Sequence, residues 1–542
     1  MKTIRHYFIN VAKFSLILIF TFYIAISLDI KLVSAYQHSK DSLQRKALVS
    51  FDVISQSNLT EEKFKIARER IQQAIKERAL ELNLSDLRLE EIPPEVFQLT
   101  QLEKLNLSRN RLTKIPPEVF QLPRLKELNL YGNRITLLPE EIGKLNNLVE
   151  LNIGANLITR IPLTIEHLAN LEYLDVSSNK ISLILYPIGK LSKLQELNIS
   201  SNNLLYISPE LSKLKNLRVL DVRSIGLNVL PSHFYHLSNL RTLFLAGNDL
   251  TELSPEISSL TNLENLYVNE LNLHKLPAEI SQLKKLKNLS ISDNNFFEFP
   301  KVISKLVNLE KLRMDGNQIE EISREIGQLI NLERLDVSNN PLSYISGEIG
   351  NLVNLELFYL RNTRLNKLPP EINKLINLAS IFLGGNNNLE NFIPELSNLK
   401  NLRKLDLNWS DFNHNSLPSG IFDLKNITSL SIEWSNLNRL PADIGKMTNL
   451  KYLYLSNNNL VELPLEIANL ERLELLTLDD NKISQFPSQL MNLKKLRTVN
   501  LSDNQIDKLP NRLDRLSHIE TIYLYSNPLP NGVPRVIIKQ AD

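Results

Sequence analysis

Apolar residues return along most of this chain with a period of 23 positions. Thirteen leucines stand 23 residues apart between Leu102 and Leu378. After two longer steps the series resumes at Ile427 and runs to Ile519, and Ala79 stands one period before Leu102. The chain therefore contains twenty units, and 17 of the 19 intervals between them are 23 residues long. A fixed period of this length predicts a stacked repeat with one continuous core rather than several separate domains.

Each unit follows the pattern LxxLxLxxNxLxxLPxxIxxL. In the unit that begins at Leu125, the alternation of Leu128 and Leu130 predicts a short strand whose leucines point inward. Pro139, which is followed by two glutamates, suits the first turn of a short helix on the opposite side. Asn133 is expected to hydrogen-bond backbone groups of the bend and of the next unit, which would otherwise be buried without partners.

This unit, repeated twenty times, resembles the leucine-rich repeat family over about residues 79–530. The Leu-Pro-x-x-Ile variant is most similar to the 23-residue class of Ras-suppressor-like and plant disease-resistance-like repeats, and to spirochaetal leucine-rich repeat proteins. The resemblance implies an α/β solenoid, a horseshoe with a parallel sheet on its concave side and short helices on its convex side. A strand spacing of about 4.8 Å gives a sheet on the order of 90 Å long. The resemblance also implies a protein ligand on the concave face.

Several units depart from the pattern, and each departure carries an expectation. Ile225 and Leu271 at the asparagine position can only pack, so we expect local bending or loosening there. Two long units, of 24 and 25 residues, should break the regular outline over residues 384–418. The chain ends soon after Pro530, which puts the completeness of a C-terminal cap in question. In six units the asparagine position holds another residue: Leu87, Ile225, Leu271, Thr363, Ser410 and Ser435.

The first 35 residues differ from the rest. A basic start is followed by an apolar run over residues 14–28, which as a helix would rise only about 22 Å, short of a hydrocarbon core of about 30 Å. That length, with a small residue at Ala35, favours a secretory signal peptide. The alternative is a short anchor that stays uncleaved, with membrane attachment through residues 14–28. The sequence leaves both open, and either route exports the protein to the envelope, the surface or the medium.

Residues 36–78 are expected to form a helical lead-in that caps the first repeat. Thr60 can begin a helix, and Phe64, Ala67, Ile71 and Ala74 then recur at helical spacing. Such an amphipathic element is needed because the first unit of a solenoid otherwise exposes its core. The predicted organisation is a leader over 1–35, a cap over 36–78, the repeat domain over 79–530 and a short tail over 531–542.

Composition narrows the function. The chain has 542 residues, no cysteine, and 62 basic against 60 acidic side chains, a net charge of +2. Such a charge gives no electrostatic case for binding nucleic acid. No phosphate-binding loop is present, and a catalytic site cannot be assembled from the sequence, so we expect no enzyme activity, cofactor or metal. His233 and His236 lie one helical turn apart, but without a third ligand they are interpreted as an exposed pair.

The outward side chains of each strand do not contribute to the core, so the fold does not fix their identity. Their middle residue is polar as far as Asp221 and then changes to aromatic and charged side chains from Phe244 onward. Unclaimed aromatics and arginines are what protein interfaces concentrate, although cross-strand aromatic pairs also stabilise sheets on their own. Tyr523 and Tyr525 are expected to belong to the terminal cover. The candidate partner-binding residues are Phe244, Tyr267, Arg313, Tyr359, Arg361, Phe382, Trp409, Trp434 and Tyr454.

The sequence therefore predicts an exported bacterial protein that holds another protein in its concave face without catalysis. Similarity to spirochaetal proteins implies a host-facing role in adhesion or virulence. One alternative is an envelope scaffold, anchored by residues 14–28, that acts on the bacterium's own proteins. The other is an intracellular signalling module of the Ras-suppressor-like kind.

Overall fold

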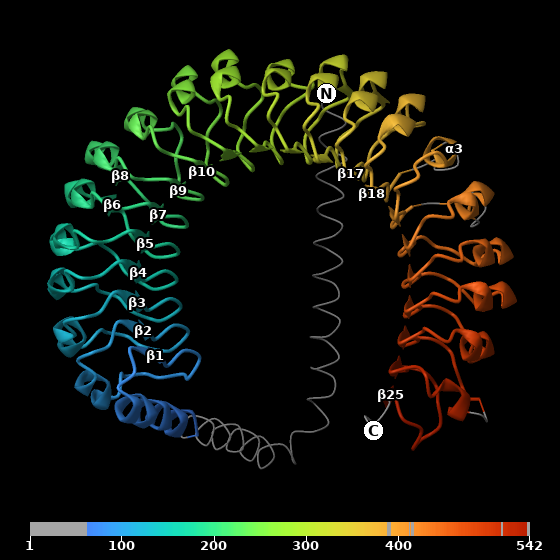
Figure 1. Ribbon diagram of the computed structural model, residues 1–542, viewed down its shortest axis with the longest axis horizontal. Helices are drawn as coiled ribbons and strands as arrows, with labels where there is room; N and C mark the ends of the chain where they lie inside the picture. The colour runs from blue at the N-terminus through green and yellow to red at the C-terminus, as the bar shows by residue number, and fades with distance from the viewer. Residues whose placement is uncertain (1–61, 387–391, 411, 413–416, 511–512, 539–542) are drawn as a thin grey trace, which may run out of the picture.

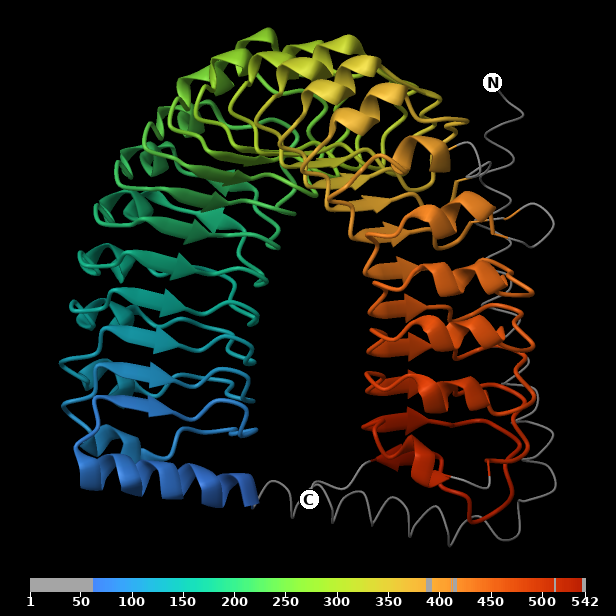
Figure 2. The ribbon, with the colours of Figure 1, turned by 45° about the vertical axis from the view of Figure 1, so that its right-hand side comes forward.

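The computed structural model describes residues 62–386, 392–410, 412, 417–510 and 513–538. The predicted leader, the apolar run over residues 14–28 and much of the predicted cap lie outside these residues. The described chain forms one arch in which strands line the inner, concave side and short helical turns line the outer, convex side (Figure 1). Figure 2 shows that the strands stack along the arch from the first units to the last. This is the predicted solenoid.

One three-residue strand per unit builds the concave sheet. Each strand pairs in parallel with the strand of the next unit, so that Leu105 lies opposite Leu82 on one side and Leu128 on the other. The strands of the concave sheet up to the end of the repeats are β1 (Glu81–Asn83), β2 (Lys104–Asn106), β3 (Glu127–Asn129), β4 (Glu150–Asn152), β5 (Tyr173–Asp175), β7 (Glu196–Asn198), β9 (Val219–Asp221), β10 (Thr242–Phe244), β11 (Asn265–Tyr267), β12 (Asn288–Ser290), β13 (Lys311–Arg313), β15 (Arg334–Asp336), β17 (Leu357–Tyr359), β18 (Ser380–Phe382), β19 (Lys404–Asp406), β20 (Ser429–Ser431), β21 (Tyr452–Tyr454), β22 (Leu475–Thr477), β23 (Thr498–Asn500) and β24 (Thr521–Tyr523).

The convex elements are single turns of 3-10 helix rather than α-helices. In η3 the backbone N–H of Ile142 donates to the carbonyl of Pro139 at 3.1 Å, and that of Leu145 donates to Ile142 at 3.0 Å. The turns are η1 (Pro94–Gln98), η2 (Pro117–Gln121), η3 (Glu140–Lys144), η4 (Leu163–His167), η5 (Tyr186–Lys190), η6 (Pro209–Lys213), η7 (Ser232–His236), η8 (Pro255–Ser259), η9 (Ala278–Gln282), η10 (Lys301–Lys305), η11 (Arg324–Gln328), η12 (Gly347–Asn351), η13 (Pro370–Lys374), η16 (Ser419–Asp423), η17 (Ala442–Lys446), η18 (Leu465–Asn469), η19 (Ser488–Asn492) and η20 (Leu513–Leu516).

Geometry explains both the tight turns and the curvature. Strands in a sheet lie about 4.8 Å apart, whereas packed α-helices need about 8–10 Å, so full helices on every unit would pull the sheet apart. The slimmer 3-10 turn fits the few residues between the proline and the next apolar position. Even so, the convex layer is wider than the strand layer, and the stack bends with its sheet inside.

Two further strand pairs form where neighbouring units lack the proline. β6 (Leu183–Ile184) pairs with β8 (Tyr206–Ile207), and β14 (Glu321–Ile322) pairs with β16 (Tyr344–Ile345). Ser208 stands where most units have proline, and its N–H donates to the carbonyl of Ile184 at 2.8 Å. Proline has no N–H to donate, so the substitution permits the pairing. Ser346 makes the equivalent bond to Ile322 at 2.9 Å.

Buried asparagines tie each bend to the preceding unit. The Nδ2 of Asn133 donates to the carbonyls of Leu130 at 2.9 Å and Leu107 at 3.0 Å, while its Oδ1 accepts the N–H of Leu112 at 3.0 Å. The predicted role of Asn133 is confirmed, except that the unit it reaches is the preceding one. A buried amide with donor and acceptor both satisfied is the condition for placing so polar a side chain in a core.

The expected loosening at Ile225 and Leu271 is wrong. Both side chains are buried, and strand register runs without interruption from β9 to β12. The amide oxygen of Asn248, in the following unit, accepts the N–H groups of both Ile225 and Leu227 at 3.1 and 3.0 Å. Apolar packing therefore fills the space of the missing asparagine at both positions, and at Ile225 the asparagine of the following unit accepts one additional N–H.

The two long units keep the register of the sheet. Ser380 pairs with Lys404 and Lys404 with Ser429, so the additional residues lie between the strands. The outline does change on the convex side, where α3 (Ile393–Leu396) is an α-helix in place of a 3-10 turn (Figure 1). The rest of the prediction for residues 384–418 falls in part on residues 387–391 and 413–416, outside the described chain.

Both ends of the sheet are covered. A helix over residues 62–77 buries Ala67, Ile71 and Ala74 against the first unit, as predicted, but leaves Phe64 exposed. Arg70 of this helix donates to the carbonyl of Asn83 at 3.0 Å, which is the acceptor that a preceding strand would otherwise use. Unpaired edge groups invite association with other chains, and the helix removes part of that hazard.

The C-terminal tail closes the other edge. β25 (Val536–Ile538) pairs antiparallel with β24, and the N–H of Leu524 donates to the carbonyl of Arg535 at 2.8 Å. The guanidinium of Arg535 donates to the carbonyls of Asn527 and Leu529, both at 2.9 Å. The cover is therefore made by the tail, while the rings of Tyr523 and Tyr525, assigned to it from the sequence, stay partly exposed.

Removing one ladder asparagine should destabilise the fold far more than removing a concave one in the same unit. Asn133→Ala leaves the buried N–H of Leu112 without a partner, for an expected loss of about 2 kcal/mol in the free energy of unfolding. The carbonyls of Leu107 and Leu130 each lose one of two amide donors and keep the one from the neighbouring asparagine. Asn129→Ala removes one exposed bond to the N–H of Tyr131 and should cost about 1 kcal/mol or less. Urea denaturation followed by circular dichroism measures both. Equal losses would contradict the proposed role of the ladder.

Candidate functional site

The concave face is polar over its first seven strands. Side-chain oxygens at the middle outward position accept the N–H two residues on, as Asn106 does from Ser108 and Asn152 from Gly154, both at 3.0 Å. These side chains hold the turn after each strand, so the polar run has a structural role. A hollow of about 700 Å³ lies over this part, but Lys104 in it is already paired with Glu81 and Glu127 at 3.3 and 3.0 Å.

Aromatic side chains replace this pattern from β10 onward. Phe244 and Tyr267 lie on neighbouring strands with ring centroids 4.7 Å apart and planes 7° from parallel. The guanidinium of Arg223 lies over the Phe244 ring, 5.1 Å from its centroid, and is ion-paired with Asp221. One face of this pair is therefore covered within the protein.

A second, longer stack crosses four consecutive strands, from β15 to β19. Arg334 lies over the Tyr359 ring at 4.7 Å, Tyr359 stacks on Phe382 at 4.2 Å, and Lys404 lies over Phe382 at 5.1 Å. We call these four residues the cationic stack. Arg361 also approaches the Phe382 ring, at 4.9 Å. Phe382 is only 7% exposed as a result, so it supports the surface rather than presenting a free ring.

Trp409 and Trp434, which we call the rim tryptophans, form the most exposed aromatic pair of the candidate set. Their rings stack at 4.7 Å with planes 4° apart, and the residues are 63% and 49% exposed. Both have left-handed backbone, with φ of 58° and 57°.

Every described unit uses positive φ at this rim position, and most place there a residue that tolerates it, such as Gly385 or Asn457. A bulky residue in this conformation costs about 1–2 kcal/mol, so the fold does not call for tryptophan there.

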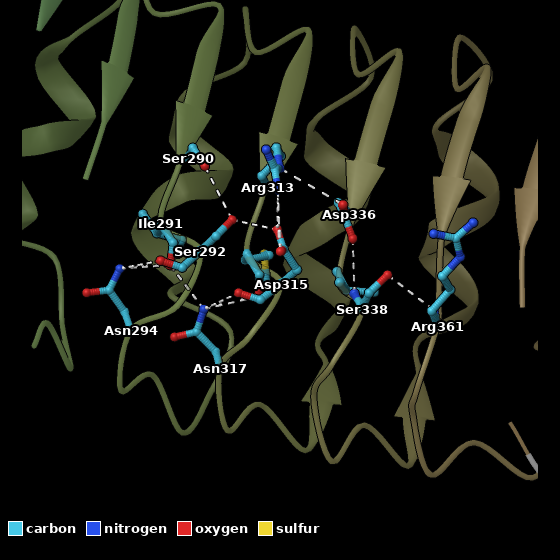
Figure 3. Close-up of polar contacts among 12 residues, drawn as sticks. Ser290, Ile291, Ser292, Asn294, Arg313, Asp315, Asn317, Asp336, Ser338 and Arg361 are labelled. Atoms are coloured by element: carbon cyan, nitrogen blue, oxygen red, sulfur yellow. Dashed lines mark hydrogen bonds and ion pairs between the residues drawn. The ribbon is translucent and has the colours of Figure 1, made fainter. Parts of the chain in front are cut away.

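Charged side chains between these aromatic groups are linked into a network (Figure 3). Arg313 contacts Asp315 at 3.3 Å and Asp336 at 4.0 Å, and Arg361 contacts Asp406 at 2.8 Å. Burial raises the pKa of the Asp336 carboxyl, and Asp315 adds to the rise; hydrogen bonds from Ser338 and the charge of Arg313 oppose it. The carboxyl of Glu433 has a raised pKa for the same first reason, burial, with Asp479 contributing. Ionisation of these two carboxyl groups is therefore less favourable in the folded protein than in water.

A hollow of about 500 Å³, which we call the central hollow, lies between the cationic stack and the rim tryptophans. Gly384 is needed at its edge because the chain passes close to Asn408 there, and a Cβ would collide with the Asn408 carbonyl. The hollow is lined by Asp315, Arg334, Asp336, Ser338, Asn339, Tyr359, Arg361, Asn362, Gly384, Asn408 and Trp409.

The structure thus divides the nine candidate residues into three groups. Phe244 and Tyr267 form one pair, and Tyr454 lies apart on β21, where within the described residues its ring stacks on no other. Burial raises the pKa of the Tyr454 phenol, with Tyr452 and Glu433 contributing. The six other candidates lie in or beside the central hollow: Arg313, Tyr359, Arg361, Phe382, Trp409 and Trp434.

Three cations of this surface were missed from the sequence: Arg223, Arg334 and Lys404. Each lies at an outward position two residues before or after the middle one, where Arg361 was found from the sequence and these three were overlooked. Arg334 precedes Tyr359 by 25 residues, and Lys404 follows Phe382 by 22. A search at one period plus or minus two positions would have found them.

The described residues contain no group of three or more His, Asp or Glu placed to hold a metal ion. His233 lies against Phe234 on the convex side, and burial together with His236 lowers its pKa. Over the same part of the chain, no helix has the length and apolar character to cross a membrane.

Comparison with known proteins gives the family. A model described as a leucine-rich repeat region matches residues 123–229, 207–340, 301–440 and 440–528, and a second, described as a leucine rich repeat, matches residues 80–135. The chain belongs to the leucine-rich repeat family. A comparison with curated protein sequences returns no match.

Solved leucine-rich repeat structures agree with this assignment. One is a leucine-rich repeat protein of Leptospira interrogans, at 32% identity and a TM-score of 0.54, with 81% of this chain and 98% of that chain covered. Another is the plant peptide hormone receptor RGFR1 in complex with RGF2, at 27% identity and a TM-score of 0.54, covering 83% of this chain and 78% of that one.

Replacing Asp336 by asparagine should change how stability depends on pH. Because its folded pKa is raised above the unfolded value of about 3.9, ionisation of Asp336 destabilises the folded state as pH rises. The unfolding free energy of Asp336→Asn relative to wild type should therefore increase between about pH 4 and pH 7. Denaturant titrations at several pH values measure it, with the exposed Asp249→Asn as control. A difference that stays constant or decreases would contradict the assignment.

Proposed function

We propose that this leucine-rich repeat chain is a non-enzymatic interaction module that binds a protein on its concave face, between β10 and β21. The observation that carries the proposal is the exposed pair of rim tryptophans beside the central hollow. Exposed aromatic residues next to paired charges are typical of the centres of protein interfaces. RGFR1, which is similar in fold and sequence, is a peptide hormone receptor whose structure contains RGF2, and this supports a polypeptide ligand.

The surface is suited to binding with little reorganisation. The strands that carry the cationic stack, from β15 to β19, are each paired on both sides. The stack also holds its side chains between neighbouring rings and cations. A surface ordered before binding loses less conformational entropy on association, which strengthens the complex. The near-zero net charge leaves recognition to local groups rather than to a long-range field.

We also propose that the protein is bacterial and exported, with a host-facing role in adhesion or virulence. The basic and apolar pattern of residues 1–35 supports export, and similarity to the Leptospira interrogans protein supports the bacterial assignment. An envelope scaffold anchored through residues 14–28 and an intracellular signalling module are the competing functions.

The rim tryptophans can be tested without damaging the fold. In the double variant Trp409→Asn, Trp434→Asn, relief of left-handed strain of about 1 kcal/mol per residue should offset the lost stacking of about 1 kcal/mol. Stability should therefore change little, while partner capture by residues 36–542 in a cross-linked pull-down should be lost. Tyr344→Ala, which removes an exposed tyrosine outside the concave sheet, should capture the partner as wild type does. Undiminished capture of the partner by the tryptophan variant would contradict the proposed binding site.

Export has its own test. Protease treatment of intact cells should remove the protein if it lies on the surface, and a mass measurement of its N-terminus should show whether residues 1–35 are cleaved. Loss of the protein with a mature start near Ala35 is the expected result. Complete protection in intact cells, with digestion only after lysis, would favour an internal role instead.

A further inference from the structure

The central hollow contains one cation that the protein leaves without a carboxylate. Arg361, on the same hollow, is paired with Asp406 at 2.8 Å, and nearby Arg313 contacts two aspartates. The guanidinium of Arg334 makes no hydrogen bond or ion pair within the described residues, and its Nε is buried without a partner. Leaving a buried donor unmet costs about 1–3 kcal/mol, so this group calls for an explanation.

The Tyr359 ring limits where Arg334 presents its donors. Its guanidinium lies over the ring of Tyr359, 4.7 Å from the centroid. The N–H groups of a guanidinium lie in one plane, and a pair of them suits a carboxylate in bidentate geometry. The carboxylates beside it, Asp315 and Asp336, are already held by Ser292, Ser338 and Arg313. Since Nε is buried, the two Nη groups, which are not buried and make no hydrogen bond within the described residues, are the donors available to a ligand.

The opposite end of the hollow is apolar. Trp409 lines it with a residue that is 63% exposed, and Gly384 between the two ends adds no side chain. Arg334 lies on β15 and is in register with Lys404 on β19, three strand steps or about 14 Å across the sheet, and Trp409 follows Lys404 by five residues. The Arg334 side chain covers about two of these positions, because its guanidinium lies over the Tyr359 ring, which leaves about 10 Å along the strands and about 17 Å in all. An extended chain advances about 3.3 Å per residue, and its residues i and i+4 point to the same side. Four residues of extended chain cover about 13 Å, and the two end side chains reach across the remainder.

We propose that the central hollow binds an extended acidic segment of the protein partner, with a Glu or Asp carboxylate on Arg334 and an apolar side chain four residues away against Trp409. The inference rests on the proposed protein-binding function and names the chemistry of its ligand. Charge complementarity sets the position of the segment, since Arg334 is the unpaired arginine of the hollow. The tryptophan face supplies apolar area at the other end.

Fluorescence can report on this site alone, because the chain contains two tryptophans and both are rim tryptophans. The probe is the capped pentapeptide acetyl-Glu-Ser-Ser-Ser-Leu-amide, titrated against the full chain with selective tryptophan excitation. We expect a saturable change in emission. The same peptide with Gln in place of Glu should bind at least about tenfold more weakly, as should an analogue with the two end residues adjacent, since a charge-assisted bond is worth about 1.5–3 kcal/mol.

Variants identify the group responsible. Arg334→Gln should weaken binding of the Glu peptide by about tenfold or more and bind the Glu and Gln peptides equally, whereas Arg334→Lys should retain part of the preference. Arg241→Gln removes the same charge at the residue just before β10, where Arg241 pairs with Glu264, and should bind as wild type does. Thermal melts by circular dichroism check that each variant is folded.

Three outcomes would overturn the inference: no change in emission with the Glu peptide, equal binding of the Glu and Gln peptides by wild type, or an equal response to sodium acetate at the same concentration. An equal response to sodium acetate would mean that any carboxylate is bound and that the site does not recognise an extended segment. If the pull-down partner is captured by wild type and lost with the rim tryptophans changed, the proposed function stands even when the peptides fail. If instead the peptides bind as expected but no partner is captured, the carboxylate site stands and the proposed protein-binding function fails.

Discussion

The fold depends on satisfying the backbone at every bend of a narrow coil. A unit of 23 residues turns sharply after each strand, and the turn buries carbonyls and N–H groups that no strand or helix can pair. The buried amide of Asn133 pairs with three of these groups at once. They are the carbonyl of Leu130 in its own unit, and the carbonyl of Leu107 and the N–H of Leu112 in the preceding unit. Because each asparagine reaches back by one period, the ladder fixes the spacing of the units as well as their shape.

This constraint also decides which positions are free to vary. Inward leucines make the core, the asparagine closes the bend, and a residue that tolerates positive φ follows the strand. The outward strand positions meet none of these demands. In the first units they still serve the turn, because Asn106 and its equivalents accept an N–H two residues on. From Phe244 onward this role is kept at only some outward positions, as where Asp336 and Asp406 accept the N–H two residues on at 3.2 and 3.3 Å. Other outward positions carry aromatic rings and cations instead.

Much of this was predictable because it repeats at fixed separation. The strands, the inward leucines and the asparagine bonds follow from the 23-residue period, and the N-terminal cap follows from the helical spacing of Ala67, Ile71 and Ala74. The 3-10 turns were missed because the pattern specifies that a helical turn begins after the proline, while its tightness is set by the spacing of strands on the other face. The β6–β8 pair was missed because it depends on the absence of proline at Ser208.

Contacts between side chains at different positions of the repeat were harder to predict for a different reason. Arg334 and Tyr359 do not occupy equivalent positions in their units, and only the stagger of side chains across adjacent strands brings them together. The sequence places Trp409 and Trp434 at equivalent positions of adjacent units, so their contact was predictable. Their left-handed backbone conformation could be seen only in the structure.

The region around the central hollow holds several features that the fold itself does not require. Two tryptophans stand in left-handed backbone, Arg334 lacks a carboxylate, and the pKa of Asp336 is raised by burial. Each of these lowers the stability of the free protein, by about 1–2 kcal/mol for a strained residue or an unmet donor. Elsewhere the ladder positions satisfy their groups with small or amide side chains. Buried side-chain groups without a partner also occur elsewhere, as at His233 and Thr477, but around the central hollow an unpaired guanidinium stands beside two exposed tryptophans. A ligand that pairs with this guanidinium and covers the rings offsets these costs on binding.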